Sequence, residues 1–164
     1  MIVSGHTLVE LLFVICLIGC ATTMLVPRVD FLHRWAVRAD IEQLYLLSLY
    51  LSRSAIASGA ETTLVFDTVH NSYCYEGTVK KLSSGVLFNV LSSVKGPPCD
   101  PKELIINPVT FKDNTVRFGP LGASSAGAVY LTDKSGSCLY ALTIPVGVFS
   151  WGKKYRYDGR WVLI

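Results

Sequence analysis

The sequence predicts an α+β protein in which a long N-terminal helix packs on an antiparallel, β-rich domain. Three observations lead to this prediction. An apolar run opens the chain, an amphipathic helical pattern follows it, and short β-branched or aromatic runs separated by turn residues fill the rest. The 164 residues suffice for one globular domain beside the apolar segment. A net charge of +3 neither requires nor excludes nucleic acid as a partner.

The apolar run extends from His6 to Val26 and contains one carboxylate. Between Thr7 and Pro27 the only formally charged side chain is Glu10. As a helix the run would be about 30 Å long, which is enough to span a bilayer. A charge at the centre of such a helix costs about 2.5–3.5 kcal/mol on insertion scales. We therefore expect residues 6–27 to form a transmembrane or filament-core helix in which Glu10 has a function.

A second helical segment follows Pro27. Large side chains recur there at three- and four-residue steps, which predicts an amphipathic helix over residues 28–58 with one face against the β-rich domain. The pattern consists of Phe31, Trp35, Ile41, Leu44, Tyr45, Ser48 and Leu51. We expect one helix from about residue 7 to residue 58, kinked at Pro27 and ended by Gly59.

Residues 59–164 show the punctuation of antiparallel β structure. Short runs alternate with Gly, Pro, Asn and Asp at the spacing typical of strands and turns. The runs are TTLVFD, SYCYEG, GVLFNVL, TVRFG, AVYLTD, CLYALTIPVG and RWVLI. The segment VKGPPCDPKE, residues 94–103, is a proline-rich loop.

Three interpretations of the N-terminus compete. A cleaved secretory signal peptide would need a basic start, a shorter apolar core and a small-residue cleavage site, none of which is present. A plain single-pass anchor explains the length of the run but leaves Glu10 unexplained. The third interpretation depends on residues 5–12, GHTLVELL, in which a Gly is followed by four residues, a Glu and an apolar helix. This segment resembles the signal of type IV pilins and type II secretion pseudopilins.

The resemblance implies a pilin fold and a specific processing step. A prepilin peptidase would cut between Gly5 and His6, remove the leader of residues 1–5 and N-methylate the new terminus. Glu10 would become the fifth residue and pair with the terminal amine of a neighbouring subunit, because a buried charge is tolerated when it is paired. The partners would be other pilins or pseudopilins in the bacterial inner membrane, with the single-pass subunit's head in the periplasm. Two features depart from the family: His6 replaces the usual Phe or Met, and the leader has no Lys or Arg.

The order of the β runs narrows the resemblance. SSGVLFNV, VRFGPLGASSAGAVYLTD and the terminal DGRWVLI are similar to segments of H-type minor pseudopilins and FimT-type minor pilins. The resemblance implies a minor pseudopilin of a type II secretion system, which assembles into a periplasmic pseudopilus that helps protein export. The alternative is a FimT-like minor pilin that binds DNA for uptake in transformation.

A basic and aromatic stretch near the C-terminus is the candidate DNA-binding segment. Cations interleaved with aromatic rings suit backbone-led binding of nucleic acid. The cations are Lys153, Lys154, Arg156 and Arg160, and the rings are Trp151, Tyr155, Tyr157 and Trp161. The competing interpretation is a terminal β-hairpin with the two tyrosines in the core and Lys154 and Arg156 in solvent.

The remaining chemistry-bearing residues suggest neither an enzyme nor a metal or cofactor site. His6, His33 and His70 are scattered, and the aspartates sit at turns. Cys16 and Cys20 lie in the apolar run as small hydrophobic side chains. In an oxidising periplasm we favour a Cys74–Cys99 disulfide with Cys138 buried and free. Pairing of Cys138 with Cys74 or with Cys99, or no disulfide, are the alternatives.

Overall fold

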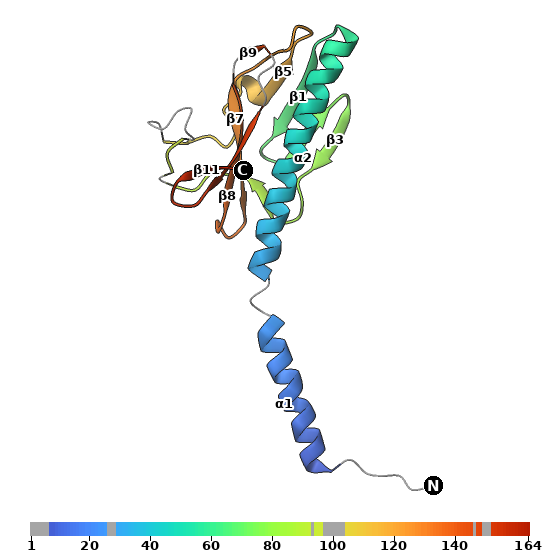
Figure 1. The fold of residues 1–164 in the computed structure, drawn as a ribbon, viewed down its shortest axis with the longest axis vertical. Helices are drawn as coiled ribbons and strands as arrows, with labels where there is room; N and C mark the ends of the chain where they lie inside the picture. Colours follow the sequence, from blue (N-terminus) through green and yellow to red (C-terminus); the bar gives the residue numbers. More distant parts are fainter. Residues whose placement is uncertain (1–6, 26–28, 93, 97–103, 146, 149–151) are drawn as a thin grey trace, which may run out of the picture. The chain divides into compact units, whose positions relative to one another are not determined.

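The structure is a computed structural model that describes residues 7–25, 29–92, 94–96, 104–145, 147–148 and 152–164. The chain divides into two compact units, residues 1–32 and 33–164. Helix α1 (Leu8–Leu25) belongs to the first unit. Helix α2 (Val29–Ser58) leads into the second unit, which holds all of the β structure and is called the head below. Figure 1 shows the order of these elements. The chain is an α+β protein.

The predicted arrangement, one long helix with a membrane-spanning first half packed on a pilin-type head, is wrong. The described residues form two helices instead of one, and α1 ends at Leu25, two residues before Pro27. A proline removes a backbone donor and disfavours helical geometry in the residue before it, which favours the end of a helix near this position. Pro27 itself lies outside the described residues.

Among the described residues, neither helix combines the length and the apolarity needed to cross a bilayer.

Helix α2 is amphipathic and packs on the head, as its pattern predicted. The side chains of Ile41, Leu44 and Leu51 are fully buried against the sheets. Trp35, which we expected on the same face, is 63% exposed. The helix ends at Ser58, and Gly59 follows with a φ of +67°, a left-handed conformation that glycine adopts without strain.

Two antiparallel sheets form the rest of the head. Within the described residues the first sheet has the order β3-β2-β1-β5-β6-β9 and the second has the order β11-β10-β8-β7-β4. The first sheet comprises β1 (Thr62–Asp67), β2 (Ser72–Tyr75), β3 (Thr78–Lys81), β5 (Thr115–Phe118), β6 (Ala123–Ser124) and β9 (Gly147–Val148). The second sheet comprises β4 (Val86–Phe88), β7 (Gly127–Asp133), β8 (Leu139–Ile144), β10 (Lys153–Tyr157) and β11 (Trp161–Leu163). A short 3₁₀ turn, η2 (Lys112–Asn114), precedes β5.

Two hydrophobic cores stabilise the head. The larger core joins α2 to both sheets and includes Leu64 and Val116 from the first sheet and Leu131 and Leu142 from the second. The smaller core lies on the other face of the second sheet, where alternate residues of its strands meet the chain around Val94. The second sheet is therefore covered on both faces, which explains why every residue of β8 is buried.

Candidate functional site

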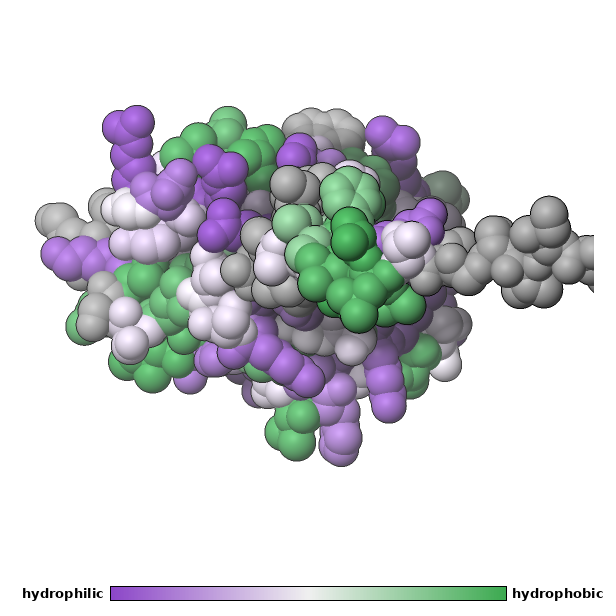
Figure 2. Space-filling view, turned by 90° about the horizontal axis from the view of Figure 1, so that it is seen from below, coloured by the Kyte–Doolittle hydropathy of each residue, from purple (hydrophilic) through white to green (hydrophobic). Residues whose placement is uncertain are grey.

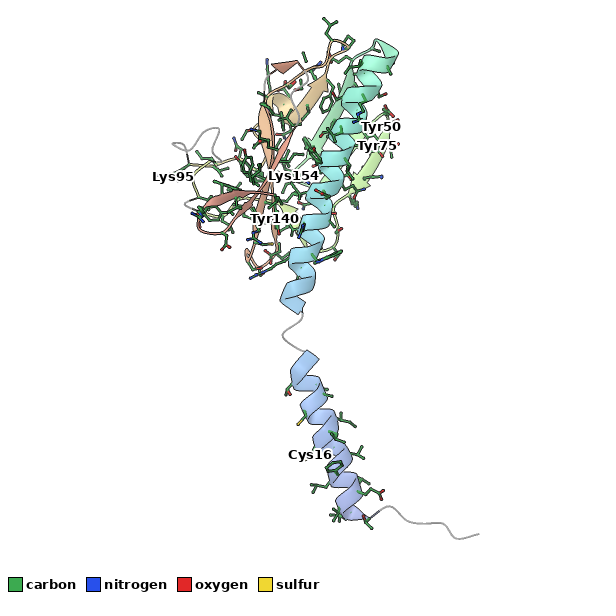
Figure 3. All side chains as sticks on the ribbon, viewed as in Figure 1. Cys16, Tyr50, Tyr75, Lys95, Tyr140 and Lys154 are labelled. Atoms are coloured by element: carbon green, nitrogen blue, oxygen red, sulfur yellow. The ribbon has the colours of Figure 1, made fainter. Side chains whose placement is uncertain are left out.

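Helix α1 exposes large apolar side chains along its length. Figure 3 shows its side chains projecting outward around the helix, with Cys16 labelled among them. The exposed fractions run from 49% at Val14 to 81% at Leu8, and the residues concerned are Leu8, Val9, Leu11, Leu12, Phe13, Val14, Ile15, Leu17 and Ile18. A helix that is apolar on all sides normally packs inside a larger assembly or against lipid. The surface of α1 is therefore one that association would stabilise.

The polar side chains near the end of α1 bond to its own backbone. The Thr22 hydroxyl donates to the carbonyl oxygens of Ile18 and Gly19 at 3.0 and 2.8 Å, and the Thr23 hydroxyl donates to that of Cys20 at 2.8 Å. These hydroxyls need no partner outside the helix, so both threonines can pack against apolar neighbours at low cost.

Glu10 is the only acidic or basic residue of α1 and lies in its first turn. A carboxylate interacts favourably with the N-terminal end of a helix, where backbone donors are unpaired. Gly5 and His6, the expected cleavage and methylation residues, lie outside the described residues. Their predicted processing stays a prediction.

The candidate DNA-binding cations lie mainly on β10, and the strand divides them between its two faces. Lys153 is exposed, whereas the side chain of Lys154 is only 17% exposed and forms an ion pair with Glu42 of α2. The ammonium group of Lys154 also lies 4.7 Å from the centre of the Tyr45 ring. We expected Lys154 in solvent, and this expectation is wrong, because α2 covers that face of the second sheet (Figure 3).

The other two cations are exposed at the hairpin between β10 and β11. Arg156 lies 3.4 Å from the carboxylate of Asp158, whereas Arg160 forms no ion pair with another described residue. Two of the four cations are therefore held by acids of the chain itself. This arrangement lowers the charge that the segment could offer to a phosphate backbone.

The aromatic side chains of the hairpin belong to the smaller core, as the hairpin interpretation predicted. Tyr155 is 7% exposed, and the Tyr157 ring lies 5.2 Å from that of Trp161. The indole N–H of Trp161 donates to the carbonyl oxygen of Lys95 at 2.8 Å. The Trp161 hydrogen bond anchors the chain around residue 95, and the buried ring of Tyr155 is not available to stack on bases. Trp151 lies outside the described residues.

No disulfide joins any two of the described cysteines. Cys74 is half-buried on β2, and Cys138 is 8% exposed. Burial, reinforced by the nearby charge of Asp133, raises the pKa of the Cys138 thiol to about 11. The predicted partner of Cys74, Cys99, lies outside the described residues, so their pairing stays a prediction.

Asp133 is a buried carboxylate that serves the turn between β7 and β8. It accepts hydrogen bonds from the Ser135 and Ser137 hydroxyls and from the backbone N–H of Cys138. Burial opposes ionisation of the carboxyl group, but these hydrogen bonds outweigh burial and hold its pKa at about 2. Within the described part of the chain, no group of three or more His, Cys, Asp or Glu residues is placed to hold a metal ion.

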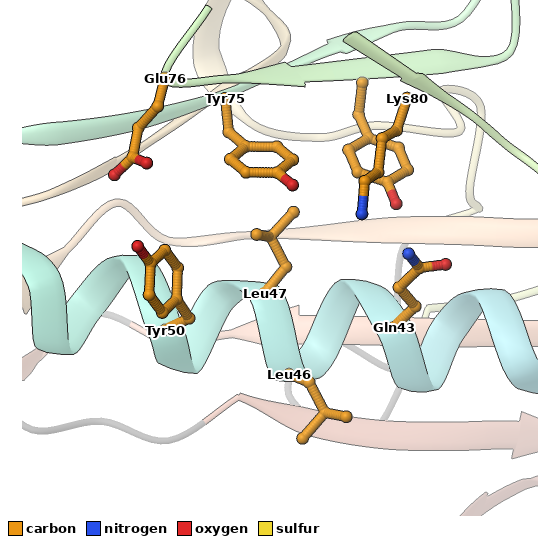
Figure 4. A pocket seen from close by; sticks show the side chains of 8 residues that line it. Gln43, Leu46, Leu47, Tyr50, Tyr75, Glu76 and Lys80 are labelled. Atoms are coloured by element: carbon orange, nitrogen blue, oxygen red, sulfur yellow. The ribbon is translucent and has the colours of Figure 1, made fainter. Parts of the chain in front are cut away.

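The structure also contains a groove that the sequence did not predict. It lies between α2 and the β2–β3 hairpin and has a volume of about 380 Å³. Its lining consists of Gln43, Leu46, Leu47, Tyr50, Tyr73, Tyr75, Glu76 and Lys80 (Figure 4). Strand β3, which completes the hairpin, has no apolar alternation, and all four of its residues are exposed. The nearest signal in the sequence was the run SYCYEG, which predicted only β2, the first strand of this hairpin.

No protein-family profile, curated protein or solved structure matches this chain. The functional argument therefore depends on three separate features of the chain itself. They are an exposed apolar helix with one acid, a basic hairpin joined to α2 by an ion pair, and a groove lined by tyrosines.

Proposed function

We propose that this chain is a minor pilin-like subunit of a type II secretion pseudopilus, in which α1 packs with the apolar helices of neighbouring subunits. The observation that supports the proposal is the surface of α1. Its large side chains are apolar and exposed on all sides, and its threonine hydroxyls bond internally. Packing such helices together removes their apolar surface from water and leaves no hydroxyl of Thr22 or Thr23 unpaired.

The proposal gives Glu10 the role of setting subunit register. Cleavage after Gly5 would create a new terminal amine on His6, four residues before this carboxylate. A carboxylate buried among apolar helices is stable only when it is paired, so each subunit would have to align its acid with the amine of a neighbour. The proposal includes the expected prepilin peptidase, the other pilins as partners, and the inner membrane with the head in the periplasm.

The DNA-binding alternative has weaker support from the head. Lys154 is paired with Glu42 and Arg156 with Asp158. Tyr155 and Tyr157 contribute to the smaller core. The exposed cations left on this hairpin are Lys153 and Arg160. A basic surface for nucleic acid normally presents more uncompensated cations than these.

The test replaces Glu10 by Ala in a host with an active type II secretion system. The fraction of the subunit in sheared, purified filaments is then measured by immunoblotting. We expect a loss of at least about tenfold, which corresponds to about 1.4 kcal/mol of lost pairing. Glu61→Ala is the control, because Glu61 is an exposed head carboxylate bonded to Arg117 at 3.1 Å. If Glu10→Ala assembles as the wild type does, the register role is wrong.

A further inference from the structure

The groove between α2 and the β2–β3 hairpin has apolar and aromatic walls. Leu47 points from α2 toward Tyr75 of β2, and Tyr50 lies beside them (Figure 4). The rings of Tyr73 and Tyr75 are stacked with their centres 6.4 Å apart, and Tyr73 is 3% exposed. One wall is therefore held in place by the larger core, to which Tyr73 belongs.

Two of the large side chains that line the groove are exposed. Leu46 is 58% exposed and Tyr50 is 55% exposed. Single exposed apolar residues scattered over a surface are ordinary, whereas exposed apolar residues that line a groove are typical of an interaction site. Figure 2 views the molecule from below, a side on which several separate groups of apolar side chains lie among polar ones. Tyrosine suits such sites because it offers a large rigid ring and a polar hydroxyl.

Opposite charges stand at the two ends of the groove. Lys80 and Gln43 lie at one end, and Glu76 lies at the other (Figure 4). The ammonium group of Lys80 lies 5.8 Å from the centre of the Tyr75 ring. None of the ion pairs found between described residues involves Lys80 or Glu76. Both charges are therefore available to a partner.

We propose that this groove binds a segment of a partner protein in which an apolar side chain lies between an acid and a base. The apolar side chain would fit between Leu47, Tyr50 and Tyr75. The acid would meet Lys80 and the Gln43 amide, and the base would meet Glu76. Lys80 pairs with Tyr73 across the hairpin, and Glu76 lies three positions farther along the chain from Tyr73, so the backbone positions of the two charges are about 10 Å apart at 3.3 Å per residue. Three residues of an extended segment cover the same length.

Charge complementarity selects this occupant over a purely apolar one. A purely apolar segment would leave Lys80, Gln43 and Glu76 partly desolvated and unpaired, which costs free energy. The groove lies entirely within residues 33–164 and includes nothing of α1. Its binding function goes beyond the proposed assembly role and can fail or succeed independently of it.

The experiment titrates the isotope-labelled, full-length protein in detergent micelles with blocked tetrapeptides and follows the amide resonances of the groove by NMR. The probe has the order glutamate, leucine, serine, lysine. One comparison peptide replaces leucine by glycine, and another has lysine at both ends. We expect saturable shifts with the probe and about fivefold weaker binding of the glycine peptide, since one buried leucine is lost.

Two variants test the charges. Lys80→Glu should weaken binding of the probe peptide about fivefold and should strengthen binding of the peptide with two lysines. Lys81→Glu is the matched control, because Lys81 is the exposed neighbour of Lys80 on β3 and does not line the groove. It should leave both affinities unchanged, and circular dichroism should show the wild-type fold for both variants.

Three results would overturn the proposal. The first is the absence of saturable shifts with any peptide up to about 10 mM, since a real site of this size should reach millimolar affinity. The second is equal binding of the probe to the wild type and to Lys80→Glu. The third is concentration-dependent self-association that Tyr50→Ala removes, which would identify a second copy of the chain as the occupant.

Discussion

Lys154 on β10 forms an ion pair with Glu42 on α2, although 112 positions separate the two residues in the sequence. The pair joins the C-terminal hairpin to the helix, and Tyr45 adds a cation–π contact with the same ammonium group. A residue that sequence reasoning assigned to DNA binding is thus part of the head's internal structure.

Removing the charge of Lys154 should destabilise the head. We expect Lys154→Met to lower the free energy of unfolding by about 1 kcal/mol, because both the ion pair and the cation–π contact are lost. Lys153→Met, which alters an exposed residue at the start of the same strand, should change it by less than about 0.5 kcal/mol. Urea denaturation checks both values. In a double-mutant cycle with Glu42→Gln, a coupling free energy near zero would show that the pair contributes nothing.

The carboxyl group of Asp133 should make the stability of the head depend on acid pH. Its pKa of about 2 in the folded protein lies below the usual 3.8, so its ionised form is stabilised by folding. This contribution, about 2 kcal/mol, is fully present above pH 4 and is lost as the pH falls toward 2. Asp133→Asn should lose it at neutral pH and show a flatter stability profile between pH 4 and pH 2.

Asp113→Asn is the control for this pH profile. Asp113 is exposed and has a φ of +54°, which asparagine tolerates at least as well. Its stability profile should match that of the wild type. Thermal unfolding followed at several pH values measures all three proteins, and a wild-type slope in Asp133→Asn would contradict the assignment.

Gly127 is required because Phe111 occupies the space beside it. A Cβ atom at this position would lie 2.5 Å from the ring of Phe111, which is buried. Gly127→Ala should therefore cost about 1–3 kcal/mol of unfolding free energy through overpacking. Gly119→Ala is the matched control, since its nearest contact would be an ordinary 3.5 Å from the Ala123 carbonyl oxygen. Chemical denaturation that ranks the two variants equally would show that the ring moves aside freely.

The parts of the fold that could be predicted are those with a local pattern. Gly59 marks the end of α2, and the runs TTLVFD and AVYLTD form β1 and β7, because helix ends and alternating strands depend on near neighbours in the sequence. Strand β3, with the residues Thr-Val-Lys-Lys, could not be predicted, because it is exposed throughout and exists through its pairing with β2.

Three of the misses, at Trp35, at Lys154 and at the groove, originate in contacts between segments that are distant in the sequence. Trp35 fits the apolar step pattern of α2 but lies outside the sector that the sheets cover. Lys154 fits a solvated strand face, but that face meets Glu42. The groove depends on the hairpin and α2 coming together. The single long helix failed for a local reason, the proline at position 27, whose effect we underestimated.

Processing at the N-terminus can be checked by intact-mass measurement. The segment GHTLVELL predicts cleavage between Gly5 and His6, followed by one added methyl group. In cells with an active prepilin peptidase, the purified protein should begin at His6. In cells without the peptidase, it should keep Met1. Retention of Met1 in both would remove the basis of the assembly proposal.

The cysteines should differ in reactivity because the structure places them in different surroundings. Cys138 is 8% exposed, and its pKa of about 11 leaves roughly one thiol in a thousand ionised at pH 8. Cys16 and Cys20 are exposed on α1. In the reduced protein, iodoacetamide should label these two residues and half-buried Cys74 well before Cys138, which should react only when urea unfolds the head.

Protein isolated from an oxidising compartment tests the disulfide separately. If Cys74 pairs with Cys99, peptide mapping without reduction should show both residues unlabelled and joined. A cross-linked peptide that contains Cys138 would show that the predicted pairing is wrong, since the hydrogen bonds from Cys138 to Asp133 hold this thiol inside the fold.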